Sequence, residues 1–101
     1  MKLLIIVAVK EFEKDIKKIL KKSDVKSFSY KDVTGFKDSS EDSIEKNWFA
    51  TDMTENESVL FYAFVKKEKV DYLFELVDDF NAKQKSASHI HIVVLCIEKS
   101  N

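Results

Sequence analysis

Four short segments of the chain are rich in β-branched and aromatic residues, and they predict β-strands. We expect these strands at residues 3–9, 25–33, 58–65 and 89–97. The first and third segments are apolar at nearly every position, which is typical of strands covered on both faces. The second alternates apolar and polar residues, as in a strand with one solvent-exposed face, and we expect it to end before Gly35.

Two segments between the predicted strands show the spacing of amphipathic helices. Residues 11–24 carry one apolar stripe and residues 66–84 carry another. The stripes consist of Phe12, Ile16, Ile19 and Leu20 in the first segment and Val70, Leu73, Phe74, Val77 and Phe80 in the second. Because such intervals bring side chains onto one side of a helix, each segment predicts a helix that packs on the sheet.

The predicted elements follow the order strand, helix, strand, strand, helix, strand, and the two halves are weakly similar in sequence. Two such units form an α+β fold of the ferredoxin-like type, a four-stranded antiparallel sheet with two helices on one face. We expect residues 1–101 to form one such domain, with the first and third strands at the centre. The second strand would lie at an edge, and a long loop, residues 38–57, would connect it to the third.

The predicted sheet has more apolar surface than two helices can cover. Along the first and third strands both alternating sets of side chains are apolar, and the last strand repeats the pattern. Since monomers rarely expose a contiguous apolar patch beyond a few hundred Å², something must cover the second face. Another copy of the chain is the simplest cover, so we expect an obligate oligomer whose sheets face inward.

The composition narrows the classes of function. The formal net charge is −1, and the chain has no arginine, no proline and one glycine. This balance gives no support for a nucleic-acid partner, and the absence of arginine removes the side chain best suited to bidentate phosphate recognition. No apolar segment is long enough to cross a membrane and residues 1–14 lack a signal-peptide cleavage pattern, so we expect no membrane insertion.

Cys96 is the single cysteine, which excludes an intramolecular disulfide and favours a reducing, cytoplasmic location. On a strand we expect it to be a small buried residue. No catalytic triad, phosphate-binding loop or zinc-protease motif occurs in the sequence. The sequence therefore predicts a binding protein and not an enzyme.

The segment SYKDVTGFK, residues 29–37, combines an edge strand with a Gly-Phe pair that opens the long loop. With this segment, the duplicated order of elements, and residues Val33, Gly35 and Phe36, the chain resembles the nitrogen-regulatory PII signalling proteins. The resemblance implies a homotrimer packed sheet to sheet, with a small ligand in the clefts between subunits. It also implies a regulatory function, in which the long loop acts on a membrane transporter or an enzyme.

Candidate ligand-binding residues follow from that resemblance. They are Gly35, Phe36 and Lys37 at the start of the long loop, Trp48 and Phe49 within it, and Lys83, Lys85, Ser86 and Ser88 before the last strand. In the PII family a glycine-rich loop before the last strand helps to hold ATP, whereas here that segment, NAKQKSASHIH, has no glycine. Because a phosphate cradle needs the close backbone approach that glycine permits, ATP is a doubtful ligand. The resemblance thus implies a shortened, diverged member whose ligand stays open.

Two interpretations of the long loop remain open. It carries many acidic residues and, within residues 38–57, the single base Lys46. It is either a solvated connection or a surface that binds a partner. Ile44 and Trp48 would share one side of a short helical turn. Trp48 and Phe49 would then pack on the sheet rim or a neighbouring subunit, or Trp48 would line an intersubunit cleft.

His89 and His91 are two residues apart on a predicted strand, so both side chains would point to one face. This spacing permits a divalent-metal site, which a symmetric trimer would multiply, as in the CutA-type metal-tolerance proteins that share the fold. Cys96 would point to the opposite face and would not complete the site. The alternatives are ordinary polar histidines, and for the whole chain a structural oligomeric module without a ligand.

Overall fold

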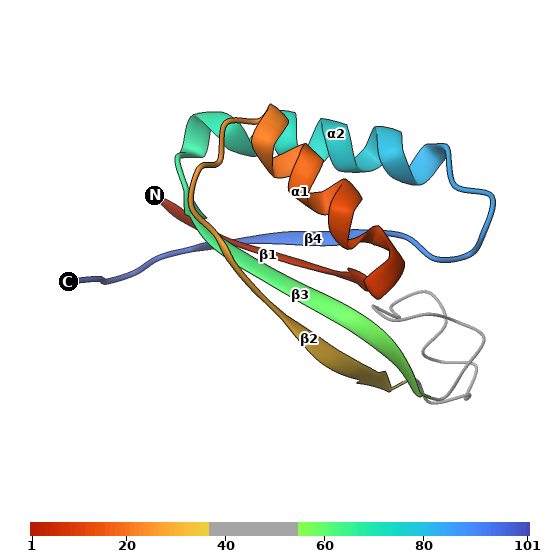
Figure 1. Cartoon of the computed structure of the whole chain (residues 1–101). Coiled ribbons are helices and arrows are strands. Elements are labelled where there is room, and N and C mark those ends of the chain that lie inside the picture. The colour runs from red at the N-terminus through yellow and green to blue at the C-terminus, as the bar shows by residue number, and fades with distance from the viewer. Residues whose placement is uncertain (37–54) are drawn as a thin grey trace.

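The computed structural model describes residues 1–36 and 55–101. These residues form a four-stranded antiparallel sheet in the order β2-β3-β1-β4, with both α-helices on one face (Figure 1). The elements are β1 (Lys2–Val9), η1 (Lys10–Phe12), α1 (Glu13–Lys22), β2 (Ser29–Phe36), β3 (Glu55–Val65), η3 (Lys67–Lys69), α2 (Val70–Ala82) and β4 (His91–Cys96). The predicted ferredoxin-like fold is confirmed, with β1 and β3 at the centre and β2 at an edge.

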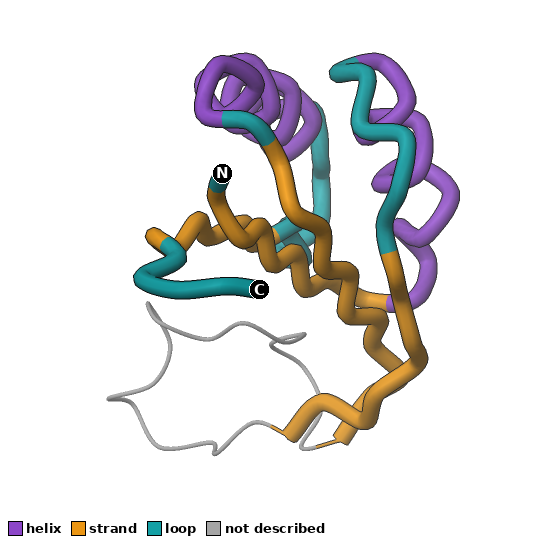
Figure 2. The backbone as a smooth tube through the Cα atoms, turned by 90° about the vertical axis from the view of Figure 1, so that its left-hand side faces the viewer, coloured by secondary structure: helices purple, strands orange, loops and turns teal. Residues whose placement is uncertain are grey.

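The hydrophobic core lies between the sheet and the two helices, which Figure 2 shows on the same side of the strands, with their axes inclined to each other. Alternate residues of the central strands contribute one half of the core, and the helix stripes contribute the other. The buried members are Leu4, Ile6, Ala8, Phe12, Ile16, Ile19, Leu20, Val25, Val59, Phe61, Ala63, Val65, Leu73, Val77 and Ile90. Since Ile6, Ile16 and Leu20 are fully buried, truncating any of them would leave a cavity.

The second strand differs from its prediction at both ends. It begins at Ser29 and not at residue 25, because Val25 is buried in the core and its N–H donates to the Leu20 carbonyl at 2.9 Å. It also continues through Gly35 to Phe36, so the expected break at Gly35 is wrong. No described glycine has a positive φ, and β3 extends far enough to keep pairing with both residues.

The third strand begins at Glu55, earlier than the predicted residue 58, so the final residues of the expected loop 38–57 belong to the sheet. The second helix carries the predicted stripe with one change. Leu76 packs against the core cluster, whereas Phe74 is half-buried outside it. Among the described helices, none combines the length and apolar character needed to cross a membrane.

Asn81 joins the end of α2 to the start of β4, a contact that the sequence pattern did not predict. Its side-chain amide nitrogen donates to the Ile90 carbonyl at 2.8 Å, and its side-chain oxygen accepts the Ile90 N–H at 2.7 Å. The backbone of a buried residue therefore depends on one side chain for both of these hydrogen bonds. Ile90 then enters the core directly before β4 begins.

We expect Asn81→Ala to lower the free energy of unfolding by about 1–3 kcal/mol, because it leaves two partly buried backbone groups without these partners. Urea denaturation at a fixed protein concentration measures the change. Gln84→Ala is the matched control: the Gln84 amide makes one bond, to the Phe80 carbonyl at 3.3 Å, and its loss should cost less than about 0.5 kcal/mol. Equal losses in the two variants would contradict this account.

Candidate functional site

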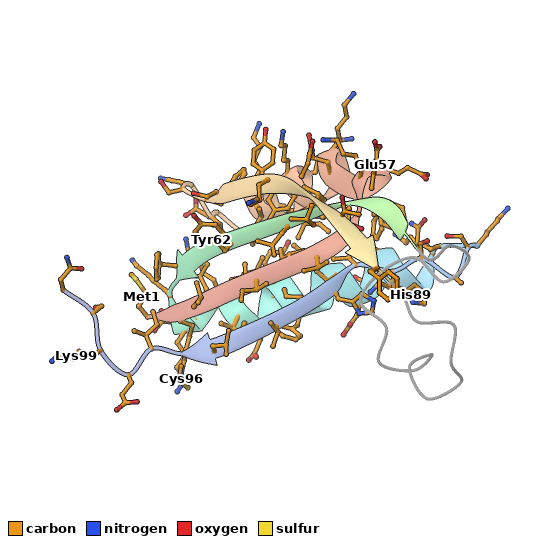
Figure 3. All side chains as sticks on the ribbon, turned by 90° about the horizontal axis from the view of Figure 1, so that it is seen from below. Met1, Glu57, Tyr62, His89, Cys96 and Lys99 are labelled. Atoms are coloured by element: carbon orange, nitrogen blue, oxygen red, sulfur yellow. The ribbon has the colours of Figure 1, made fainter. Side chains whose placement is uncertain are left out.

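The sheet face that the helices leave uncovered is apolar across three strands. Figure 3 looks onto this open face, with the helices behind the sheet. Residues that pair across β3, β1 and β4 share a side of the sheet. They form three rows: Phe64, Leu3 and Leu95; Tyr62, Ile5 and Val93; and Leu60, Val7 and His91.

Large side chains of the open face are exposed in the single chain. The exposed fractions are 59% for Phe64, 43% for Tyr62 and 44% for Leu95. Phe64 and Leu95 flank Leu3 in one row, and Tyr62 lies in the next row, so the exposed side chains belong to one contiguous patch. The apolar character of this face is confirmed.

The predicted ligand residues that the structure describes come from one end of the sheet. Figure 1 shows β2 ending, β4 beginning and α2 ending at this same end of the molecule. Gly35 is buried and pairs with Asn56, whereas Phe36 beside it is 63% exposed. Lys37, Trp48 and Phe49 lie outside the described residues.

The segment between α2 and β4 supplies two ammonium groups and two hydroxyls. Lys83 is the C-terminal cap residue of α2, where its N–H donates to the Phe80 carbonyl at 3.1 Å. Lys85 and Ser86 are exposed, and the Ser86 hydroxyl accepts the N–H of half-buried Ser88 at 3.3 Å. Such a segment can contact an anion through side chains, but it has no glycine that would let the backbone approach a phosphate closely.

At the same end of the sheet, Lys10 holds two carboxylates together. Its Nζ forms ion pairs with Asp32 and with Glu13, the latter at 3.3 Å. The hydrogen bond to Asp32 raises the pKa of Lys10, and the bond from Lys10 lowers the pKa of Glu13. Lys10 and Asp32 also line a surface hollow of about 250 Å³, together with Val33, Thr34 and Glu57.

This ion-pair cluster was missed by the sequence analysis. Lys10 follows a predicted strand, but Asp32 is 22 residues away, and the two come together because β1 and β2 both pair with β3. No spacing in the sequence signals such a contact. The lysine is neutralised by its own neighbours, so the described part of this hollow does not present a free cation to an anionic ligand.

The two histidines lie near each other at the start of β4. His91 belongs to the open face, where it pairs with Val7, and His89 is exposed just before the strand. Burial lowers the pKa of the His91 imidazole, and the nearby charge of His89 lowers it further. Within the described residues, no group of three or more His, Cys, Asp or Glu side chains could hold a metal ion.

Cys96 has the predicted orientation but not the predicted burial. It pairs with Lys2, so it points to the opposite face of the sheet from His91. The thiol is exposed at the strand end, and Lys2 Nζ donates to its Sγ at 3.1 Å. This hydrogen bond lowers the pKa of the Cys96 thiol. The expectation of a small buried cysteine is wrong, because Cys96 is the last residue of β4 and its side chain is exposed to solvent there.

Comparison with known proteins supports the fold. No family model matches the sequence, and no curated protein matches it either. Among solved structures, the chain is similar to CPII, a nitrogen regulatory PII-like protein from Thiomonas intermedia K12 bound to ADP, AMP and bicarbonate. The TM-score is 0.61 at 15% sequence identity, over 97% of this chain and 94% of that one. The fold is therefore the ferredoxin-like fold of PII-like proteins, as the sequence resemblance implied.

The lowered pKa of His91 predicts a loss of stability on acidification. The folded chain binds this proton less readily than the unfolded chain, so protonation favours unfolding as the pH falls below about 6.5. We expect the thermal midpoint to fall between about pH 7 and pH 5, and His91→Gln to reduce the slope. Thermal unfolding at constant ionic strength and protein concentration measures it.

His89→Gln is the matched control for this experiment, because the His89 side chain is exposed whereas His91 is half-buried. It should retain most of the wild-type pH dependence, since burial is the larger cause of the shift at His91. A His91→Gln variant with an undiminished slope between these pH values would show that the loss of stability comes from other groups.

Proposed function

We propose that the protein is a PII-like regulatory trimer of the cytoplasm, which binds a small anionic ligand between subunits and acts on another protein. The observation that carries the proposal is the apolar open face. In a soluble assembly this face requires a cover, and further copies of the same chain supply a cover of matching shape and chemistry. Sheet-to-sheet packing of copies would also turn the exposed sheet ends into clefts between neighbouring subunits.

The proposed ligand class rests on the side chains at the sheet end. Lys83 and Lys85 supply positive charge and form no ion pair with another described residue, and Ser86 and Ser88 supply hydroxyls. The similar protein CPII was solved with ADP, AMP and bicarbonate, which are all anions. Because this segment has no glycine, we favour an anion held by side chains over a triphosphate held by backbone N–H groups.

The partner-binding part of the proposal rests on the sequence between β2 and β3. This segment includes Asp38, Glu41, Asp42, Glu45 and Asp52. An acidic segment of this kind fits a basic surface on a membrane transporter or an enzyme. Trp48 and Phe49, which are large aromatic residues within it, would serve as the anchors of that contact.

A metal-binding protein of the CutA type is the second candidate. The nearness of His89 to His91 favours it, since their charges act on each other and a trimer would bring three such pairs into one assembly. A structural oligomeric module without a ligand is the third possibility, and the experiments below separate the three.

If copies of the chain pack through the open face, a charge placed on that face should dissociate the oligomer. Phe64→Lys should yield a single-chain species in sedimentation velocity at low micromolar concentration, because a lysine cannot be buried there without a partner. Tyr72→Lys is the control, since Tyr72 is 40% exposed on α2 and not on the sheet. At about 0.3 M salt, exposed charge contacts are screened and only the apolar contact is measured. A wild-type chain that sediments as a monomer would contradict the proposed trimer.

The ligand is tested by thermal shift with ADP, AMP, ATP and bicarbonate, and separately with Cu²⁺, Zn²⁺ and Ni²⁺. A ligand selective for the native state at 100 times its Kd stabilises it by about 2.7 kcal/mol, which moves the midpoint by several degrees. We expect an anion to stabilise the wild type and to lose this effect in Lys83→Ala/Lys85→Ala. Lys66→Ala/Lys99→Ala removes the same charge elsewhere and should keep the response.

A metal response that disappears in His89→Ala/His91→Ala would support the second candidate in place of the first. If neither anions nor metals shift the midpoint of the wild-type protein, the ligand-binding part of the proposal fails and the structural module remains. The sedimentation result stands independently of this outcome.

A further inference from the structure

β4 is an edge strand of the sheet, and its sequence has none of the usual features that protect an edge. Among the described residues no strand lies beyond it, and Figure 3 shows it as the outermost strand, with Cys96 at its end. Residues 90–97 contain no lysine, aspartate, glutamate or proline. The pairing with β1 advances without a break, so no bulge turns the edge away. Edge strands usually carry one of these features, because their outer backbone groups otherwise pair with another strand.

The other edge of the sheet, β2, is protected in the usual way. It carries Lys31 and Asp32, and most of its side chains are exposed. The side chains of β4 residues 92–94 are apolar and half-buried, and Leu95 is 44% exposed. Because alternate residues of a strand point to opposite faces, apolar surface remains on both faces of the β4 edge. A neighbour that fits this edge is therefore a strand that is apolar on both of its own faces.

The hydrogen bonds of Asn81 show which backbone groups of β4 point outward. In an antiparallel ladder the N–H and C=O of one residue point to the same side, and the side alternates from residue to residue. Asn81 binds both groups of Ile90, and the pairing with β1 begins only at the next residue. By alternation, the N–H and C=O groups of Ile92, Val94 and Cys96 also point away from β1. No described strand takes these donors and acceptors.

We propose that this edge pairs with the same edge of a second copy of the chain, so that two sheets join through antiparallel β4 strands. A two-fold axis perpendicular to the sheet gives this arrangement and keeps the helices of both copies on one side. Asn81 fixes the register, because its bonds to Ile90 end the ladder there. Of the remaining outward residues Val94 is the central one, so the axis passes beside it. Val94 then faces Val94 of the second copy, and Ile92 faces Cys96 of the second copy.

This register places apolar side chains opposite each other on both faces of the joined sheet. The opposed residues are Val94 with Val94 and Ile92 with Cys96 on the helix side, and Val93 with Leu95 and His91 with Ile97 on the open side. A shift by one residue would bring helix-side residues opposite open-side residues, which the two-fold axis does not allow. Cross-strand contacts between such apolar side chains stabilise a sheet in addition to its backbone hydrogen bonds.

A second copy of β4 fits this edge better than the alternatives. Pairing with β2 of another copy would put Lys31 and Asp32 opposite apolar residues of β4. A strand of an unrelated protein would need apolar residues on both faces over the same six-residue length, and soluble proteins rarely expose such a strand. The contact uses a strand edge and not the open face, so it stands whether or not the proposed trimer forms.

Disulfide capture tests the register. The background is Phe64→Lys/Cys96→Ser, because Phe64→Lys should remove packing through the open face and Cys96→Ser removes the native thiol. Val94→Cys then places a thiol directly opposite its symmetry mate, at a Cα separation of about 5.5 Å, which suits a disulfide. Val93→Cys is the matched control, because its mate is a diagonal neighbour about 7–8 Å away. With oxidised glutathione, Val94→Cys should form covalent dimers at least about tenfold faster than Val93→Cys in non-reducing electrophoresis.

A second capture experiment uses the native thiol. In the Phe64→Lys background, Ile92→Cys places a new thiol opposite Cys96 of the second copy, so each dimer should form two disulfides. Within one chain the two positions are about 13 Å apart along the strand, so an intrachain disulfide is excluded. The intact mass after oxidation should be twice the chain mass less four hydrogens. Phe64→Lys with Cys96 as its single thiol is the control and should give no comparable dimer.

Sedimentation tests the contact without covalent capture. Phe64→Lys should be a single chain at low micromolar concentration and should form dimers at about 0.5 mM, because one pair of short strands is a weak contact. Adding Cys96→Glu places a charge on the edge, which Lys2 can pair with inside the chain, and should remove the dimer. Adding Ser27→Glu makes the same change in net charge before β2 and should leave the dimer in place.

Circular dichroism checks that each variant folds. The proposal is overturned if Val94→Cys and Val93→Cys cross-link at equal rates, if Phe64→Lys stays a single chain at the higher concentration, or if Cys96→Glu leaves its dimer unchanged. Faster capture of Val93→Cys would indicate a different register and would also overturn it. None of these failures affects the proposed trimer, which the sedimentation of the wild-type chain tests separately.

Discussion

The structure depends on a mismatch between the sheet and its cover. Both central strands are apolar on both sides, but the two helices cover only one side. On the covered side, Ile6, Val59 and Phe61 are almost completely buried, and burial of this kind provides most of the driving force for folding. On the other side Tyr62 and Phe64 remain exposed. The same alternation that builds the core therefore builds an unsatisfied surface, and both the proposed oligomer and its clefts follow from it.

At the end of the sheet, lysines lie in two different electrostatic environments. Lys10 is held by two carboxylates, so its charge contributes to local structure and is largely cancelled. Lys83 and Lys85 lie in the neighbouring segment without a described ion pair, so their charge remains available. Asn81 holds the beginning of β4 by two hydrogen bonds to Ile90, and the Lys83 N–H donates to the Phe80 carbonyl at the end of α2. The segment between Lys83 and Ile90 is therefore anchored at both ends. The candidate ligand groups thus lie on a short connection with fixed ends.

The fold could be predicted from the sequence because its signals are local and repeated. Apolar runs defined the central strands, and stripes such as Ile16 and Leu20 defined the helices. What could not be predicted depends on contacts between distant segments. The start of β2 is set by burial of Val25 against α1, and its end is set by how far β3 continues to pair with Gly35. The strand propensity of the β2 residues themselves predicts neither of these two boundaries.

The candidate site was harder to predict than the fold for the same reason. The lysines and serines before β4 are candidates because of a family resemblance, and they stay a prediction. The ion pair of Lys10 with Asp32 and the approach of Lys2 to Cys96 require the sheet register. The open sheet face and the charged outer surface of the helices also differ in the kind of contact that each can make. Contacts through the open face would bury apolar area and resist salt, whereas contacts through the charged helix surface would be screened by it.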